Sequence, residues 1–297
     1  WEEKRRDLRE SLLKYGYENG YFIYGYNDYG EKVGSADCDE GKIYLNPQTW
    51  AVLAGILPEE ALSQVMDQVE EKLSCPFGYM QCAPSYTHGT DRLGRSTYFQ
   101  PGLVENGSVY IHGVAFKVVA DCMLKRADRA YDTLKRLSVY NPANPDSGME
   151  PYAVSNMYIG PENKYRAGDA PMSWITGSAG WLYRAVTEYI YGVRAEFGGL
   201  RICPCLPHEW LETKNAVKVI RKFRNAVYEI VYAKGESDAL IADGESNFPA
   251  VQTIRAALKG FECFCVVAGE GDNASGLFSL PDDVRAAIAV GKGAFCA

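Results

Sequence analysis

A change in residue pattern near residue 199 constrains the fold of this chain more than any other feature. Before it, apolar residues recur at the spacing of amphipathic helices in about six segments, arranged as consecutive pairs. After it, short runs rich in β-branched and aromatic residues begin with LRICPCLP at 200–207. The sequence therefore predicts a mainly α-helical portion over residues 1–199 and a β-rich portion over residues 200–297. From about residue 235 the periodicity is weak.

The predicted helices are joined by loops of different lengths. They cover about 1–15, 47–56, 58–74, 107–125, 127–138 and 178–192. Residues 20–34 alternate aromatic side chains around Asn27–Gly30, which predicts a hairpin-like excursion with Asp28 in its turn. Residues 75–105 are predicted to be mostly loop, and a loop of that length favours a functional role.

The balance of charged residues argues against a nucleic-acid partner. The 297-residue chain carries 31 Lys and Arg against 38 Asp and Glu, a formal net charge of −7, whereas binding to nucleic acid needs basic stripes. The sequence contains no run of about 18 apolar residues, so it predicts no membrane-spanning segment.

The nine cysteines include two closely spaced pairs, Cys203-Pro-Cys205 and Cys263-Phe-Cys265. These pairs have too few spaced partners for a zinc ribbon. Because residues two apart in a strand share one face, both pairs are interpreted as small buried hydrophobes. This interpretation predicts a reducing, cytoplasmic compartment and no metal site.

Two further features have ordinary explanations when each is taken alone. The stretch APMSWITGSAGW at 170–181 places Thr176 and Gly177 just before an apolar run, a composition typical of a helix cap. His112 stands alone in the apolar stretch SVYIHGVAF, as a histidine satisfied within a core often does. Neither feature by itself indicates a ligand site.

Four long segments, in order along the chain, share their pattern with a known family. They are KIYLNPQTWAVLAG (42–55), GLVENGSVYIHGVAF (102–116), MEPYAVSNMYIGPENKYRAG (149–168) and APMSWITGSAGWLYRAVTEYIYGVRAEFGGLRICPCLP (170–207). Together they resemble glycoside hydrolase family 94, the inverting phosphorylases of β-linked gluco-oligosaccharides such as cellobiose, cellodextrin and β-1,2-glucan phosphorylases. The resemblance covers roughly residues 1–233.

The resemblance implies a fold and an assembly. The family has an (α/α)6 barrel followed by a C-terminal β-sandwich, so this chain is expected to hold about half of the barrel over residues 1–199 and the β-sandwich module after it. The remaining parts of the family's architecture would precede Trp1. The expected protein is thus the C-terminal portion of a longer enzyme, which would be a homodimer.

The resemblance also changes the interpretation of His112, Thr176 and Gly177, which match the family's phosphate-binding residues. An inverting hydrolase needs a carboxylic acid and a carboxylate base, but a phosphorylase needs only the acid, because phosphate is already an anionic nucleophile. A phosphate cradle is needed instead. Thr176 can donate through its hydroxyl, Gly177 allows a close approach of its backbone N–H, and a helix N-terminus favours an anion.

Five residues are implied to bind the sugar: Glu105, Asn106, Tyr158, Arg166 and Trp174. Glu105-Asn106 resembles a sugar-contacting pair, with an exposed loop as the alternative. Trp174 is expected to stack on a pyranose ring, with core packing as the alternative. Val104 stands where disaccharide-specific members often have Lys, which leaves the acceptor specificity open.

No catalytic residue is assigned. The family's general acid lies in an Asp-Trp-Asn-Asp motif that this sequence lacks, and neither Asp28 nor Asp91 stands in a matching context. The leading hypothesis is phosphorolysis of a β-glucoside to α-glucose 1-phosphate, with inorganic phosphate as co-substrate, no cofactor, and an inactive isolated chain. The alternatives are an inverting hydrolase on the same barrel and a non-catalytic carbohydrate- or phosphate-binding module.

Overall fold

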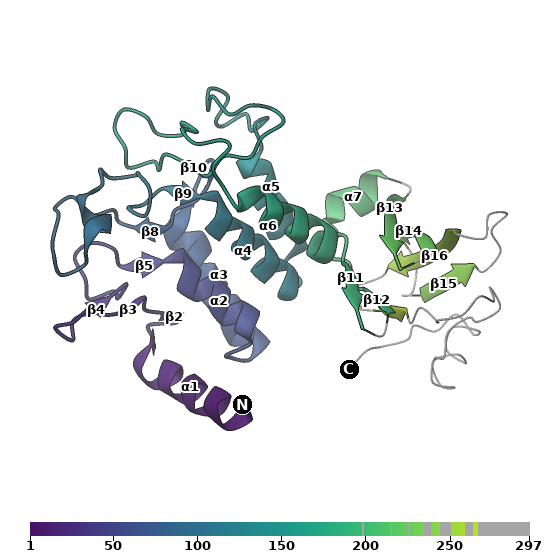
Figure 1. Cartoon of the computed structure of the whole chain (residues 1–297), viewed down its shortest axis with the longest axis horizontal. Helices are drawn as coiled ribbons and strands as arrows, with labels where there is room; N and C mark the ends of the chain where they lie inside the picture. The colour runs from purple at the N-terminus through teal and green to yellow at the C-terminus, as the bar shows by residue number, and fades with distance from the viewer. Residues whose placement is uncertain are drawn as a thin grey trace. The chain divides into compact units, whose positions relative to one another are not determined.

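A computed structural model of the chain describes residues 1–197, 199–214, 216–224, 226–234, 239–243, 251–258 and 264–266. The chain divides into two compact units, Trp1–Ala185 and Val186–Ala297 (Figure 1). The boundary predicted from the sequence lies further along, after residue 199. The assignment of these units to domains of an enzyme stays a prediction.

The first unit contains the predicted helices, with ends that move by a few residues. They are α1 (Glu2–Tyr15), α2 (Leu45–Ala54), α3 (Glu59–Leu73), α4 (Ile111–Met123), α5 (Ala127–Leu137) and α6 (Ser178–Arg184). The last predicted helix is not uniform, because the chain continues after α6 as a π-helical segment, Ala185–Ile190. These helices form no closed barrel among the described residues, and the half-barrel assignment stays a prediction.

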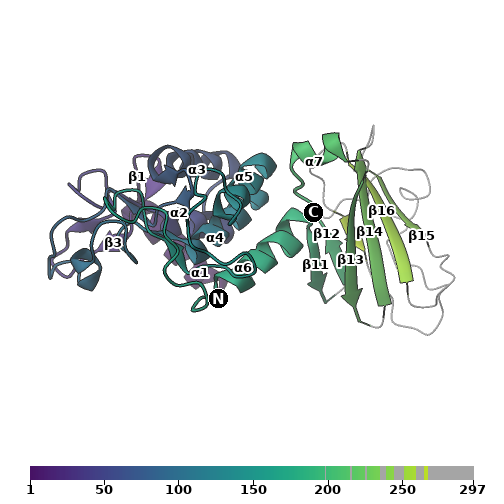
Figure 2. The same cartoon turned by 90° about the horizontal axis from the view of Figure 1, so that it is seen from above.

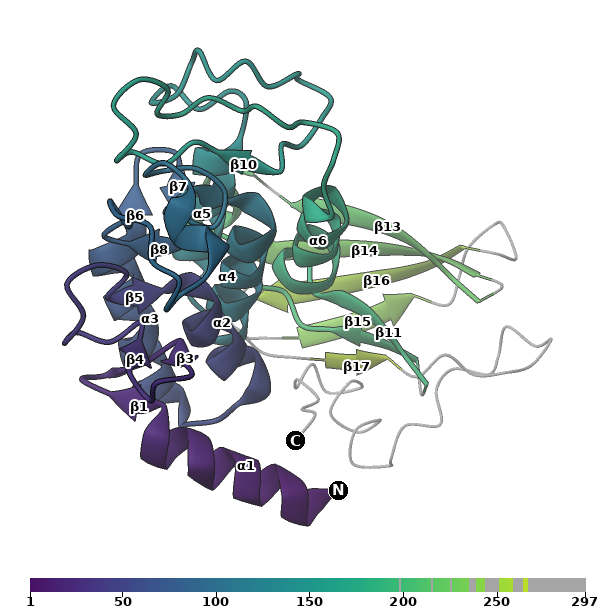
Figure 3. The same cartoon turned by 60° about the vertical axis from the view of Figure 1, so that its left-hand side comes forward.

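The burial of each helix follows from its sequence. Helix α3 has acidic residues in its first turn and Lys72 in its last, which complement the helix dipole. It buries one face, formed by Leu62, Val65, Met66, Val69 and Leu73. Helix α4 is apolar nearly all round and packs against α2, α5 and α6 (Figure 3). Helix α4 is therefore the centre of the first unit.

Helix α1 differs from the others because it buries none of its residues. The apolar face predicted from its sequence is present, yet Leu8 is 63% exposed and Tyr15 is 57% exposed. Its contacts with the rest of the unit include a hydrogen bond from Arg9 Nε to the carbonyl of Ile56, 2.7 Å long.

Short strand pairs connect the helices of the first unit. The pairs are β1 (Tyr17–Glu18) with β2 (Tyr21–Phe22), β3 (Gly25–Tyr26) with β4 (Lys32–Val33), β5 (Ile43–Tyr44) with β8 (Cys82–Ala83), β6 (Ser74–Cys75) with β7 (Gly78–Tyr79), and β9 (Val109–Tyr110) with β10 (Met157–Tyr158). The β3–β4 pair confirms the predicted hairpin. The predicted loop 75–105 is more ordered than expected, since it holds β7, β8 and a 3-10 turn, Arg95–Tyr98.

The strands β5 and β9 lead directly into α2 and α4, and backbone hydrogen bonds fix both helix starts. The N–H of Leu45 donates to the carbonyl of Gln81 (2.9 Å), and the N–H of Gln81 donates to Ser108 (2.7 Å). The N–H of Ile111 donates to Asn156 (3.0 Å). The bonds from Leu45 and Ile111 satisfy N–H groups that a helix leaves unpaired at its first turn. The bond between Ile111 and Asn156 places the start of α4 next to a segment distant in sequence.

A buried ammonium group joins α3, α4 and α5. Lys117 of α4 is fully buried, and its Nζ lies 2.7 Å from Glu70 Oε1, 2.6 Å from Asp121 Oδ2 and 3.0 Å from Thr133 Oγ1. The ammonium also lies 4.0 Å from the centre of the Tyr79 ring. Burial acts to lower the pKa of Lys117, but the charges of Asp121 and Glu70 outweigh it and raise the pKa.

The second unit is built mainly of strands, as predicted. One sheet is antiparallel in the order β11 (Val193–Glu196), β12 (Gly199–Ile202), β17 (Phe264–Val266). The other has the order β13 (Val217–Phe223), β14 (Ala226–Lys234), β16 (Val251–Leu258), β15 (Ala239–Asp243), with β14 and β16 parallel (Figure 2). A short helix, α7 (His208–Thr213), accompanies them. The β-sandwich assignment stays a prediction.

The cysteine interpretation holds only in part. Cys205 is buried and free, as expected of a small buried hydrophobe. Cys203 lies just after β12, is only half-buried and is disulfide-bonded, so the interpretation as a small buried hydrophobe is wrong for this residue. Cys263 and the side chain of Cys265 lie outside the described residues.

Candidate phosphate and sugar site

The structure brings His112 and Gly177 together at the starts of α4 and α6. Gly177 immediately precedes α6, and a Cβ atom built on it would lie 3.1 Å from Cε1 and 3.4 Å from Nδ1 of the His112 ring. The first distance is tighter than ordinary van der Waals contact. Any larger residue at position 177 would therefore cover the Cε1–Nδ1 edge of the imidazole, and glycine leaves that edge uncovered.

The other side of the His112 ring faces the interior. Its ring centroid lies 5.0 Å from that of Phe116 and 6.1 Å from that of Trp181. Nε2 is buried and makes no hydrogen bond with the described residues. Burial lowers the pKa of His112 below its ordinary value of 6.5. The imidazole is thus held neutral near pH 7, with one edge packed and one edge toward Gly177.

Thr176 forms the turn that leads into α6. Its Oγ1 accepts a hydrogen bond from the N–H of Ser178, 2.9 Å long, and contacts the Ser178 hydroxyl. Thr176 therefore has the helix-start role that its residue type alone suggests. It also fixes the Thr176 hydroxyl beside Gly177, because the turn defines the side-chain orientation.

Asn156, whose role the sequence did not indicate, holds the two halves of this site together. Its carbonyl accepts from the N–H of Ile111, and its own N–H donates to the carbonyl of Met172, 2.7 Å away. Its side-chain Nδ2 donates to the carbonyl of Ile175, 3.1 Å away. Asn156 thereby ties the segment before Thr176 to the first residue of α4. An asparagine inside a matched segment carries no signal of this role until its partners are known.

The predicted sugar-binding pair splits into one exposed and one buried side chain. Glu105 is exposed, whereas Asn106 is fully buried. The Asn106 amide donates to the carbonyls of Tyr86 and Phe99, both 2.8 Å away, and accepts from the N–H of Tyr86 at 2.7 Å. Asn106 therefore clamps the 86–99 loop in this structure and presents no surface to a sugar.

Tyr158 also lies in the core. It is fully buried, and its hydroxyl donates to the carbonyl of Leu137 over 2.8 Å. Burial raises the pKa of its hydroxyl above the ordinary range. A sugar has no access to this side chain in the described arrangement, so its position corrects the expectation of direct contact. The family resemblance located the segment, but it did not reveal that both residues of β10 are buried.

Trp174 and Arg166 lie at the surface. Trp174 is 68% exposed, and its Nε1 donates to Glu150 Oε1 over 3.2 Å. The ring of Tyr152 lies 6.0 Å away, centroid to centroid. Two exposed aromatic rings held side by side offer apolar faces of the kind on which a pyranose stacks. Arg166 forms an exposed ion pair with Asp169, 2.8 Å long.

The surroundings of Asp28 and Asp91 do not support either residue as a general acid. Asp28 lies in an exposed turn, as predicted. Asp91 accepts a 2.6 Å hydrogen bond from the Tyr98 hydroxyl. The part of the chain that the structure describes contains no group of three His, Cys, Asp or Glu side chains arranged to hold a metal ion. None of its helices combines the length and apolar character needed to cross a membrane.

Comparison with known proteins agrees with the family resemblance. The sequence is 44% identical to solabiose phosphorylase of Paenibacillus borealis over 69% of this chain and 27% of that protein. It is 36% identical to the 3-O-beta-D-glucopyranosyl-beta-D-glucuronide phosphorylase of the same species, over 76% of this chain and 29% of the relative. It is also 36% identical to N,N'-diacetylchitobiose phosphorylase of Vibrio proteolyticus, over 72% of this chain and 26% of that protein.

The chain thus spans a little over a quarter of the length of these relatives. The family model for the glycosyl hydrolase 94 superfamily catalytic domain matches residues 1–192. That range covers the helical unit and the residues of the candidate site. The chain belongs to the glycosyl hydrolase 94 superfamily.

Proposed function

We propose that this chain is part of an inverting phosphorylase, which cleaves a β-linked gluco-oligosaccharide with inorganic phosphate and releases α-glucose 1-phosphate. Membership of the glycosyl hydrolase 94 superfamily supports the proposal, as do three relatives that are named phosphorylases. The observation that carries it is the uncovered edge of His112 beside Gly177.

The phosphate is proposed to lie against Gly177. There the imidazole of His112 and the hydroxyl of Thr176 border the same point, and the backbone N–H of Gly177 can approach the anion because no side chain intervenes. A bound anion favours the protonated imidazole, which then offsets part of the phosphate charge. These residues hold and orient the nucleophile, and such positioning is a major source of catalysis in bimolecular reactions.

The sugar is proposed to contact Glu105, Arg166 and Trp174, the exposed members of the predicted set. Trp174 supplies a stacking face, Glu105 accepts hydrogen bonds from hydroxyl groups, and Arg166 donates. Asn106 is proposed to contribute indirectly, by holding the 86–99 loop in place. Tyr158 is proposed to contribute indirectly, by fixing β10 to the carbonyl of Leu137 through its hydroxyl.

The 297-residue chain alone is proposed to be inactive. Its sequence contains no Asp-Trp-Asn-Asp motif, which in the family carries the general acid. An inverting hydrolase on the same fold remains the competing activity, and dependence of turnover on inorganic phosphate separates the two.

Removing one phosphate ligand should weaken phosphate binding selectively. His112→Ala or Thr176→Val is expected to raise the dissociation constant for inorganic phosphate by one to two decades, because a hydrogen bond to a charged group contributes about 1.5–3 kcal/mol. Isothermal titration calorimetry on the 297-residue chain measures this. Thr176→Ser, which keeps the hydroxyl, and His208→Ala, in the second unit, are the matched controls. Unchanged phosphate affinity in both His112→Ala and Thr176→Val would show that the cradle is assigned wrongly.

A further inference from the structure

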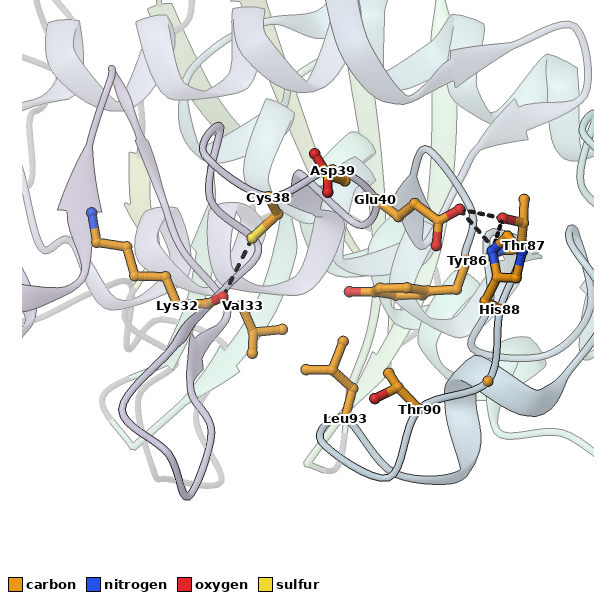
Figure 4. Close-up of a pocket in the computed structure, with 11 residues that line it drawn as sticks. Lys32, Val33, Cys38, Asp39, Glu40, Tyr86, Thr87, His88, Thr90 and Leu93 are labelled. Atoms are coloured by element: carbon orange, nitrogen blue, oxygen red, sulfur yellow. Dashed lines mark hydrogen bonds between the residues drawn. The ribbon is translucent and has the colours of Figure 1, made fainter.

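A pocket of about 460 Å³ lies outside the phosphate site (Figure 4). It is bordered by the end of the β3–β4 hairpin, by residues 38–40 and by the loop 86–93. Its volume falls within the range of about 300–1,000 Å³ that small-molecule sites occupy. The proposed phosphate and sugar contacts do not use these residues.

The floor of the pocket is apolar. Val33 and Tyr86 are buried, and Leu93 packs against them. The Tyr86 hydroxyl already has a partner, since it lies 2.8 Å from the hydroxyl of Tyr44. The floor therefore presents carbon atoms, which suit the apolar face of a ring.

One wall carries a hydrogen-bonded series, Glu40–Thr87–His88 (Figure 4). The Thr87 hydroxyl donates to Glu40 Oε1, since an ionised carboxylate can only accept. The N–H of Thr87 donates to the same oxygen over 3.0 Å, which holds the carboxylate in place. The Thr87 hydroxyl also lies 2.8 Å from His88 Nδ1. Because the Thr87 hydroxyl proton is directed at Glu40, the Thr87 oxygen accepts a hydrogen bond from the Nδ1–H of His88.

The series has a chemical consequence for His88. In the neutral imidazole one nitrogen carries the proton and the other accepts. A proton on Nδ1 leaves Nε2 as an acceptor on a residue that lines the pocket. Asp39 and Glu40 add carboxylate oxygens to the same rim, and the rim cation, Lys32, is already ion-paired with Glu18 and Asp37.

A rim of acceptors over an apolar floor suits a ring that donates through several hydroxyl groups and carries no negative charge. We propose that this pocket binds a neutral sugar residue and that His88 accepts a hydrogen bond from one of its hydroxyl groups through Nε2. The proposal rests on the proposed function for its choice of ligand, since the substrates of a glycoside phosphorylase are saccharides. The pocket is a second saccharide site, separate from the residues assigned to the reaction.

Histidine NMR tests the proposal, because the chain has three histidines, His88, His112 and His208. On the 297-residue chain at a pH above about 7.5, where histidine is neutral, ring proton–nitrogen correlations should show the proton of His88 on Nδ1. Titration with D-glucose should shift the His88 signals and leave those of His208 in place. Titration with inorganic phosphate should shift His112 and leave His88 in place.

Two variants test whether the Thr87 and His88 side chains themselves contribute to glucose binding. Thr87→Val keeps the shape of the pocket but removes the hydroxyl, so the His88 proton should lose its preference for Nδ1 and glucose affinity should fall about two- to tenfold. His88→Ala should weaken glucose binding by a similar factor. The proposal is overturned if glucose does not bind, or if it binds without moving His88 and with equal affinity in both variants. A failure of phosphate to move His112 counts instead against the proposed function, so the two failures are distinguishable.

Discussion

Replacing Lys117 with methionine should lower the free energy of unfolding by about 3–5 kcal/mol, because it removes the cation from a buried ion pair and leaves the carboxylates behind. Lys117 and Asp121 are both fully buried, and the Glu70 side chain is 13% exposed. Methionine matches the length of lysine, so the loss reflects charge more than volume. Helices α3, α4 and α5 meet at this ammonium group, and the change should weaken their packing together.

Urea denaturation followed by far-ultraviolet circular dichroism measures the effect. Arg129→Met is the matched control, because Arg129 also pairs with Glu70, at 3.6 Å, yet its side chain is 57% exposed. Exposed pairs contribute about 0–1 kcal/mol. Equal and small effects of the two substitutions would contradict the view that the buried network stabilises the first unit.

The second large effect is the expected absence of phosphorolysis by the 297-residue chain. Proton donation to a leaving oxygen accelerates such reactions by about 10²–10⁴, and no residue of this chain matches the family's general acid. Asp91 is engaged by Tyr98, and Asp28 lies in an exposed turn. A chain that binds phosphate without an acid should therefore hold the nucleophile and not turn over.

The test is an assay for glucose 1-phosphate after incubation with a β-glucoside and inorganic phosphate. Full-length solabiose phosphorylase of Paenibacillus borealis, supplied with its own substrate, is the positive control. Release of glucose 1-phosphate by the isolated chain would mean that another carboxylate donates the proton. Asp28→Asn and Asp91→Asn would then show which one.

The helices were predictable because their burial is periodic. The spacing of Leu62, Val65, Met66 and Val69 indicates one buried face, and Pro58 with two following glutamates marks where it begins. Apart from the β3–β4 hairpin, the two-residue strand pairs were not predictable, because two residues carry no periodicity. Their positions depend on distant partners, such as Gln81 for Leu45.

In the candidate site, too, some features were predictable from the sequence and others depend on contacts between distant segments. Residue types alone favoured a helix cap for Thr176 and a core position for His112, and both descriptions hold in part. The family resemblance singled out His112 and Gly177, and the structure places Gly177 against the His112 ring. The linking role of Asn156, the burial of Asn106 and Tyr158, and the series Glu40–Thr87–His88 all depend on contacts between segments far apart in the sequence.

The most direct test of the account is the pKa of His112 with and without inorganic phosphate, measured by NMR on the 297-residue chain. Without phosphate, burial should hold this pKa below 6.5. An anion against the imidazole favours its charged form, so saturating phosphate should raise the pKa. The NMR signals of His208 should not respond to phosphate, and Thr176→Val should require more phosphate for the same change at His112. A pKa of His112 that is the same at zero and saturating phosphate would contradict the assignment of this site to phosphate.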